Sequence, residues 1–124
     1  MKARVLYIED NEANMYLISY MLTARGHLML QAWDGAEGVE RALTARPDLI
    51  LLDIQLPGMD GYETARRLRA EPDLAGIPIV ALTSYAMVGD REKALAAGCS
   101  GYIEKPINPD TFVEQIEQFL PASL

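Results

Sequence analysis

Four short apolar runs of this chain each end in side chains that can do chemistry. The side chains at their ends are the acidic pair Glu9-Asp10, the lone Asp53, the hydroxyl pair Thr83-Ser84, and Lys105 before Pro106. If the three carboxylates converge, they repel one another at neutral pH unless a cation lies among them. Magnesium suits such a set, because it takes one or two carboxylates and keeps several of its waters. The sequence therefore predicts a Mg²⁺ site.

Beside a bound cation, the carboxylate of Asp53 could act as a nucleophile and form an acyl phosphate. Phosphoryl transfer requires that the charge on the transferred group be neutralised by the metal and by fixed donors. Thr83 offers a hydroxyl for this purpose and Lys105 a positive charge. With one cysteine and one histidine in the chain, a zinc site is disfavoured. The residues thus predict chemistry on phosphoryl groups.

The runs that must position these residues are typical of strands buried on both faces of a parallel sheet. They cover residues 4–8, 49–52, 79–82 and 102–103, and a less apolar run at 28–33 predicts a strand nearer an edge. Helical patterns fill the gaps. We expect helices from Asn11 to Gly26, from Gly35 to about Arg46, from about Tyr62 to Ala70, from Arg91 to Ala97, and from about Pro109 to Leu120.

Five strands that alternate with five helices predict an α/β fold with a doubly wound parallel sheet. Right-handed crossovers and the flavodoxin-like strand order 2-1-3-4-5 would place Glu9-Asp10 directly beside Asp53. Ligands bind beyond the carboxyl ends of the strands in such sheets. The chain shows no repeat or linker, so we expect one domain over residues 1–124 and no effector domain.

Composition narrows the classes of partner. The single cysteine, Cys99, allows no disulfide within the chain, which favours a reducing compartment such as the cytoplasm. A formal net charge of −7 makes free nucleic acid and anionic membranes poor partners. No apolar run approaches the roughly 20 residues that span a bilayer. A cytoplasmic protein with protein partners is expected.

Taken together, the motifs resemble the receiver domain of two-component response regulators. The pattern consists of Glu9-Asp10-Asn11 with Asn14, Asp53 with Leu56-Pro57 and Asp60-Gly61, Ala81-Leu82-Thr83, and Lys105-Pro106. The resemblance spans residues 4 to 120 and is closest in type to single-domain regulators of the DivK type. It also extends to the receiver modules of hybrid histidine kinases, so an excised module is an alternative.

The resemblance implies roles for the site residues. Asp53 would accept a phosphoryl group from a histidine kinase or a histidine phosphotransfer protein. Asp10 and Asp53 would bind Mg²⁺ directly together with the backbone carbonyl of Gln55, while Glu9 would act through water. Lys105 would pair with the phosphoryl group. The protein would be a signalling module that assists its own phosphotransfer and autodephosphorylation, not an enzyme.

The resemblance also implies a switch. Thr83 would bind a phosphoryl oxygen and move inward, and Tyr102 would then fill the vacated space. The 86–120 face, which includes Ala86-Met87-Val88, would change shape and contact a downstream protein or support a phosphorylation-dependent dimer of an otherwise monomeric protein. The Lys105-Pro106 peptide would be cis, so that a tight turn aims the ammonium group into the site.

The same residues also allow three other functional hypotheses. An aspartate-nucleophile phosphohydrolase of the haloacid dehalogenase type would need a second Asp where Gln55 stands, and a capping insertion. A flavodoxin-like electron carrier would need a phosphate-binding loop where Glu9-Asp10-Asn11 stands. A degenerate receiver would bind partners without phosphorylation.

We expect His27 to lie at the surface, Cys99 to fill a small space, and Trp33 to be partly exposed at a strand end.

Overall fold

The computed structural model describes residues 2–56, 58–83 and 89–122. Its centre is a five-stranded parallel sheet with the strand order β2-β1-β3-β4-β5, as the sequence predicted. The strands are β1 (Arg4–Ile8), β2 (Leu28–Ala32), β3 (Leu49–Asp53), β4 (Ile79–Thr83) and β5 (Gly101–Glu104). The less apolar β2 lies at one edge of the sheet, where Leu28 and Gln31 are exposed.

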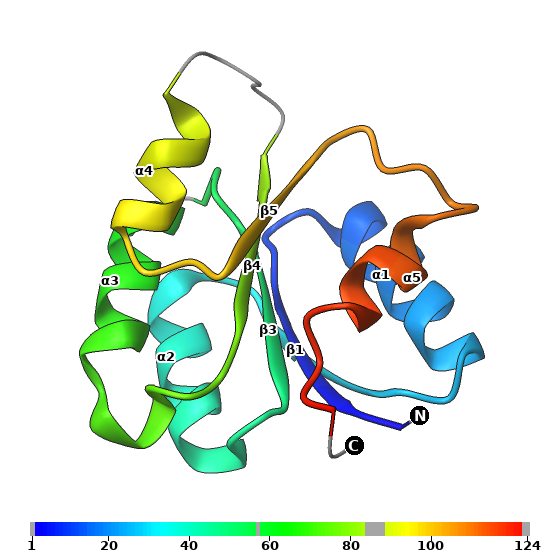
Figure 1. Ribbon diagram of the computed structural model, residues 1–124, viewed down its shortest axis with the longest axis horizontal. Coiled ribbons are helices and arrows are strands. Elements are labelled where there is room, and N and C mark those ends of the chain that lie inside the picture. The colour runs from blue at the N-terminus through cyan, green and yellow to red at the C-terminus, as the bar shows by residue number, and fades with distance from the viewer. Residues whose placement is uncertain (1, 57, 84–88, 123–124) are drawn as a thin grey trace.

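Helices cover both faces of the sheet. Within the described residues they are α1 (Glu12–Ala24), α2 (Gly35–Ala45), α3 (Gly61–Ala70), α4 (Asp90–Ala96), α5 (Phe112–Glu117) and the short 3₁₀ helix η1 (Pro72–Leu74). In Figure 1, α2, α3 and α4 lie on one side of the sheet, and α1 and α5 lie on the other. This three-layer arrangement buries both faces of β1, β3 and β4.

The alternation of side chains along the strands divides the core into two clusters. On the α2–α4 side the cluster includes the strand residues Leu6, Ile8, Ile50 and Leu52 together with Ala42, Leu68 and Ala94. On the α1/α5 side it includes Val5, Tyr7, Leu49 and Leu51 together with Met15, Leu22 and Phe112. Every residue of β3 and β4 is buried, which explains why these strands are continuous apolar runs in the sequence.

Local capping sets where the helices begin. The side chain of Asn11 accepts a hydrogen bond from the Asn14 amide and caps α1. Asp34 caps α2 in the same way through the Glu37 amide, and the Glu37 carboxylate accepts in return from the Trp33 amide. This reciprocal pair is similar to a capping box, except that Glu37 accepts from the residue before the cap. The turns that lead from β1 into α1 and from β2 into α2 are therefore stabilised by hydrogen bonds to side chains from the same short segments.

The last helix is shorter than the predicted span of Pro109 to Leu120. A turn at Asn108 replaces the expected first turn of the helix. The Asn108 side chain accepts a hydrogen bond from the Asp110 amide, and its backbone carbonyl accepts one from the Phe112 amide. After Glu117 the chain tightens, since the Leu120 amide bonds back three residues to the Glu117 carbonyl. The apolar periodicity predicts the buried face, which includes Phe112, Val113 and Ile116, but turns at both ends replace regular helix.

The surface position predicted for His27 is wrong. Only 3% of this residue is exposed. Its Nδ1 accepts a hydrogen bond of 3.0 Å from the Ala3 amide, and its Nε2 lies 2.9 Å from Oε2 of Glu117 on α5. The imidazole therefore joins the first strand to the last helix. Cys99 is buried and Trp33 is 40% exposed, as predicted.

Among the described residues, none of the helices is both long enough and apolar enough to cross a membrane. Ser84 and the expected contact segment Ala86-Met87-Val88 lie outside the described residues, as does Pro57.

Candidate functional site

The site lies at the carboxyl ends of the central strands, and β1 and β3 bring its acidic residues together. The two strands pair in parallel with Ile8 opposite Leu52. One further step along each strand brings Glu9 opposite Asp53. Both are buried, with 0% and 3% exposure, whereas Asp10 is exposed at the rim. The adjacency predicted from the strand order is thus present in the structure.

Lys105 reaches the same site from the end of β5. Its backbone amide donates a 2.7 Å hydrogen bond to the Thr83 carbonyl, which extends the pairing of β4 and β5 by one residue. The peptide bond between Lys105 and Pro106 is cis. The ammonium Nζ lies 3.1 Å from Oδ2 of Asp53 and 3.6 Å from Oε1 of Glu9. A partly buried cation therefore faces two buried carboxylates.

The Glu9 carboxylate is held by three donors. Oε1 accepts a 2.8 Å hydrogen bond from the phenol of Tyr7, and Oε2 accepts from the backbone amides of Asp10 and Asn11. Burial raises the pKa of Glu9, and so does the neighbouring Asp53 carboxyl. Burial and the Glu9 charge also raise the pKa of Tyr7, so its hydroxyl keeps its proton and donates.

The loop after β3 is shaped around Asp53. The Gln55 amide donates a 3.0 Å hydrogen bond to Oδ1 of Asp53. The other carboxylate oxygen, Oδ2, faces the ammonium group of Lys105. At the start of α3, Gly61 packs against this loop: a Cβ there would lie 2.3 Å from Cα of Ile54 and 2.8 Å from the Asp53 carbonyl oxygen. Glycine is therefore required where α3 approaches the strand end. The side chain of Gln55 is exposed.

The donor set fits a divalent cation. Glu9, Asp10 and Asp53 each offer an oxygen, and these oxygens lie within 4.8 Å of one another. Within the described part of the chain, the ion pairs made by Glu9 and Asp53 are with one cation, the ammonium of Lys105. The ionised forms of the three acids would therefore leave two negative charges uncompensated. Oxygen ligands and a double positive charge are what Mg²⁺ supplies and prefers. The chemistry of these residues therefore suits a magnesium ion.

The two residues predicted to form the switch lie in neighbouring strands, β4 and β5. Thr83 ends β4 and is buried, with 3% exposure. Tyr102 lies in β5, opposite Ala81 of β4. It is half-buried and packs against the core on the α2–α4 side. The structure thus brings Thr83 to the rim of the site and Tyr102 to the neighbouring edge strand.

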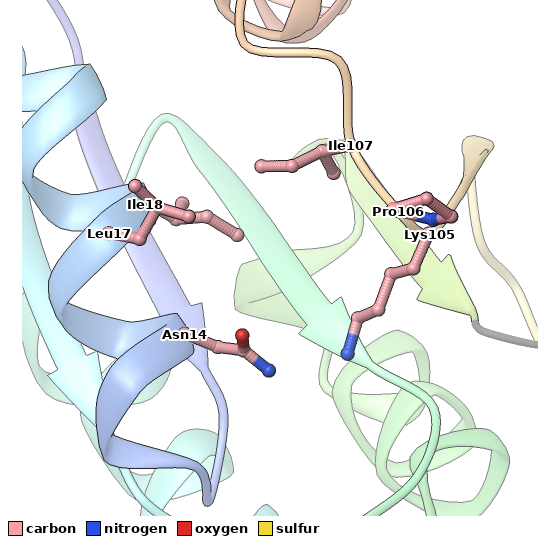
Figure 2. Close-up of a pocket in the computed structure, with 6 residues that line it drawn as sticks. All are labelled: Asn14, Leu17, Ile18, Lys105, Pro106 and Ile107. Atoms are coloured by element: carbon pink, nitrogen blue, oxygen red, sulfur yellow. The ribbon is translucent and has the colours of Figure 1, made fainter.

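A groove opens beside the acidic residues. It has a volume of about 470 Å³ and lies between α1 and the segment after β5, lined by Asn14, Leu17, Ile18, Lys105, Pro106 and Ile107. Figure 2 shows the Lys105 ammonium and the Asn14 amide pointing into this space, with Ile18 and Ile107 on opposite walls. The groove thus reaches Lys105, whose ammonium contacts Asp53.

Tyr7 is the site residue that sequence reasoning missed. It stands among the aliphatic residues Val5, Leu6 and Ile8, two residues before Glu9, and so on the same face of the sheet. That period-two spacing between a phenol and a carboxylate is the signal that could have identified it.

The chain is similar in sequence to known proteins. The sequence model of the response regulator receiver domain family matches residues 5–117. A polar-differentiation response regulator DivK of Brucella anthropi is 41% identical over 120 residues, which cover 97% of this chain and 98% of the relative. The corresponding DivK of Brucella ovis is 40% identical over the same shares.

Solved structures of two further proteins are also similar. The chemotaxis response regulator CheY4 of Vibrio cholerae has a TM-score of 0.91 at 29% identity, with 97% of this chain and 100% of that chain covered. The receiver domain of the sensor histidine kinase PA1611 from Pseudomonas aeruginosa has a TM-score of 0.87 at 35% identity, with 96% and 98% covered. The latter structure holds a magnesium ion in its active-site cleft.

Proposed function

The chain belongs to the response regulator receiver domain family, and on this premise we propose that it is a phosphorylation-controlled signalling module whose phosphoacceptor is Asp53. The observation that carries the proposal is the position of the Asp53 carboxylate. It is buried at the end of β3, within 3.1 Å of the Lys105 ammonium and beside two other carboxylates. This membership favours a receiver over the phosphohydrolase and the electron carrier.

The transfer follows from how Asp53 is held. With Oδ1 bound to the Gln55 amide, Oδ2 attacks the phosphorus of a phosphohistidine on the donor protein. The O–P bond forms as the N–P bond breaks, and the imidazole nitrogen keeps the electron pair. Lys105 neutralises charge on the phosphoryl oxygens, and the Thr83 hydroxyl donates to one of them. Fixed donors of this kind stabilise the charge that develops during phosphoryl transfer.

Asp10 and Asp53 would hold Mg²⁺ directly, together with the backbone carbonyl of Gln55, and Glu9 would act through water. When bound, the ion supplies positive charge to the phosphoryl oxygens. Meanwhile the chain's own residues position the acceptor: the Gln55 amide orients Asp53, while the Tyr7 hydroxyl and two backbone amides orient Glu9.

Signalling would then pass to the 86–120 face. Phosphorylated Asp53 draws Thr83 toward it, and Tyr102 on the adjacent strand turns into the space beside β4. This is a local charge event that shifts a two-state surface. The altered face binds a downstream protein or a second copy of the chain.

The proposed donor is a histidine kinase or a histidine phosphotransfer protein in the cytoplasm, reached through the groove beside Lys105. A single-domain regulator spanning residues 1–124 is the form that the DivK relatives support, because the matched region covers 98% of their length. A receiver module from a hybrid kinase is the second candidate, supported by the likeness to the PA1611 receiver.

The test is the intact mass of the protein after incubation with acetyl phosphate and Mg²⁺. We expect a gain of about 80 Da, the mass of one phosphoryl group, on the native chain. The gain should vanish in Asp53→Asn and when EDTA removes the metal. Asp60→Asn serves as the matched control and should still gain the mass. A gain that survives Asp53→Asn would place the acceptor elsewhere.

A negative result with acetyl phosphate is followed by the same assay with a phosphohistidine protein as the donor. Absence of transfer from both donors would contradict the proposal and favour a receiver that signals by binding alone.

A further inference from the structure

Tyr7 places a polar group at the base of the site, deep in the sheet. The residue has 0% exposure, and its neighbours in β1 are aliphatic. A buried phenol requires a hydrogen-bond partner, and its hydroxyl donates to Oε1 of Glu9 at 2.8 Å. The ring itself belongs to the core cluster on the α1/α5 side. The phenol therefore adds one specific interaction, with Glu9.

That interaction limits what Glu9 can still bind. An ionised carboxylate has about four lone-pair positions. Two on Oε2 accept from the amides of Asp10 and Asn11, and one on Oε1 accepts from Tyr7. The Lys105 ammonium lies 3.6 Å from the same Oε1. The neighbouring Asp53 carboxyl also interacts with Glu9, so at most about one position is left, and Lys105 lies beside it.

Distance alone does not keep Glu9 from a cation. Its carboxylate lies within 4.8 Å of an oxygen of both Asp10 and Asp53, and a small rotation would bring it into contact with an ion between them. The hydrogen bond from Tyr7 opposes that rotation, because the rotated carboxylate would leave a buried phenol without a partner.

We propose that Tyr7 is a positioning residue that keeps Glu9 out of direct metal coordination, so that Glu9 acts only through a metal-bound water. This inference rests on the proposed function, in which Glu9, Asp10 and Asp53 surround Mg²⁺. It assigns the choice between direct and water-mediated binding to one hydroxyl group. Mg²⁺ favours such an arrangement, since it gives up its waters reluctantly.

The number of waters on the bound ion tests the proposal. Mn²⁺ replaces Mg²⁺ as the probe. The relaxation rate of the water nuclei in a solution of the Mn²⁺-loaded protein gives the number of waters coordinated to the ion. In Tyr7→Phe, Glu9 is free to turn and coordinate directly, so we expect one water fewer than in the native protein. In the double variant Tyr7→Phe/Glu9→Gln the native number should return. Glu9→Gln alone should leave the native number unchanged.

Controls separate this role from a general effect on folding. Tyr20→Phe removes an exposed hydroxyl on α1 and should leave the count unchanged. Thermal unfolding shows that each variant is folded. Glu9→Gln tests, without changing Tyr7, whether Glu9 contacts the ion directly in the native protein.

Three outcomes would overturn the inference: an unchanged count in Tyr7→Phe, a loss of one water that persists in the double variant, or a gain of one water in Glu9→Gln alone. A native protein that does not bind Mn²⁺ would instead overturn the proposed function, and the inference with it.

Discussion

The ammonium group of Lys105 lies 3.1 Å from Oδ2 of Asp53, although 52 positions separate the two residues in the chain. The contact exists because β3, β4 and β5 are neighbours in a parallel sheet, so that all three end at the same edge. Lys105 thus has two effects on the site: it neutralises part of the acidic charge, and it competes with any other cation for that charge.

Replacing Lys105 by Met should therefore have two opposite effects. Phosphoryl uptake from acetyl phosphate should fall by about 100-fold, the typical cost of losing one fixed donor in a transition state. Mg²⁺ affinity should rise, because a competing positive charge is gone. Intact mass over time and Mg²⁺ titration measure the two. Lys93→Met, at an exposed position of α4, is the control, and unchanged uptake in Lys105→Met would remove Lys105 from the proposed mechanism.

The raised pKa of Glu9 predicts how stability depends on pH in the absence of metal. Because burial and Asp53 raise its pKa above the ordinary 4.5, the folded protein holds the Glu9 proton more firmly than the unfolded chain. The protonated Glu9 therefore stabilises the fold fully below pH 4.5, and this stabilisation is lost as the pH rises through the raised pKa of the folded state. The free energy of unfolding should therefore fall over this interval in the native protein and fall less in Glu9→Gln.

Urea unfolding in EDTA, from about pH 4 to about pH 8, measures the difference between the two proteins. Glu12→Gln, at the exposed start of α1, should follow the native curve. Parallel curves for the native protein and Glu9→Gln would contradict the prediction.

Truncation of Glu117 should destabilise the fold far from the site. Nδ1 of His27 accepts from the Ala3 amide, so Nε2 carries the proton and donates to Oε2 of Glu117. Glu117→Ala would leave this buried donor without its partner, which costs about 1–3 kcal/mol of unfolding free energy. Denaturant unfolding provides the measurement. Glu114→Ala removes an exposed carboxylate from the same helix, and an equal loss in both variants would argue against a specific role for His27.

Cys99 should react slowly in the folded protein. It is buried, and burial raises the pKa of its thiol from 9.0 to about 11. Two pKa units reduce the thiolate fraction roughly 100-fold, and burial restricts access further. Alkylation with iodoacetamide, followed by mass, should therefore be at least about 100-fold slower in buffer than in concentrated urea. Comparable rates in the two conditions would show that the segment opens readily.

Much of the fold follows from local patterns. The apolar runs of β3 and β4 are long enough to indicate buried parallel strands, and the strands alternate with helices, which leads to the confirmed order β2-β1-β3-β4-β5. Because parallel strands end at one edge of such a sheet, the sequence predicts that Glu9, Asp53 and Lys105 lie beside one another. The family assignment, now confirmed, came from the same residues.

Local patterns in the sequence set the strand ends, and therefore which residues meet at the site. How particular polar groups find hydrogen-bond partners depends instead on the folded arrangement. His27 looks like a surface residue until Glu117, 90 positions away, is brought against it. Tyr7 looks like a core residue until its hydroxyl is seen to donate to Glu9. Hydrophobic periodicity reports which face of an element is buried, whereas a hydrogen bond depends on where two separate atoms finally lie.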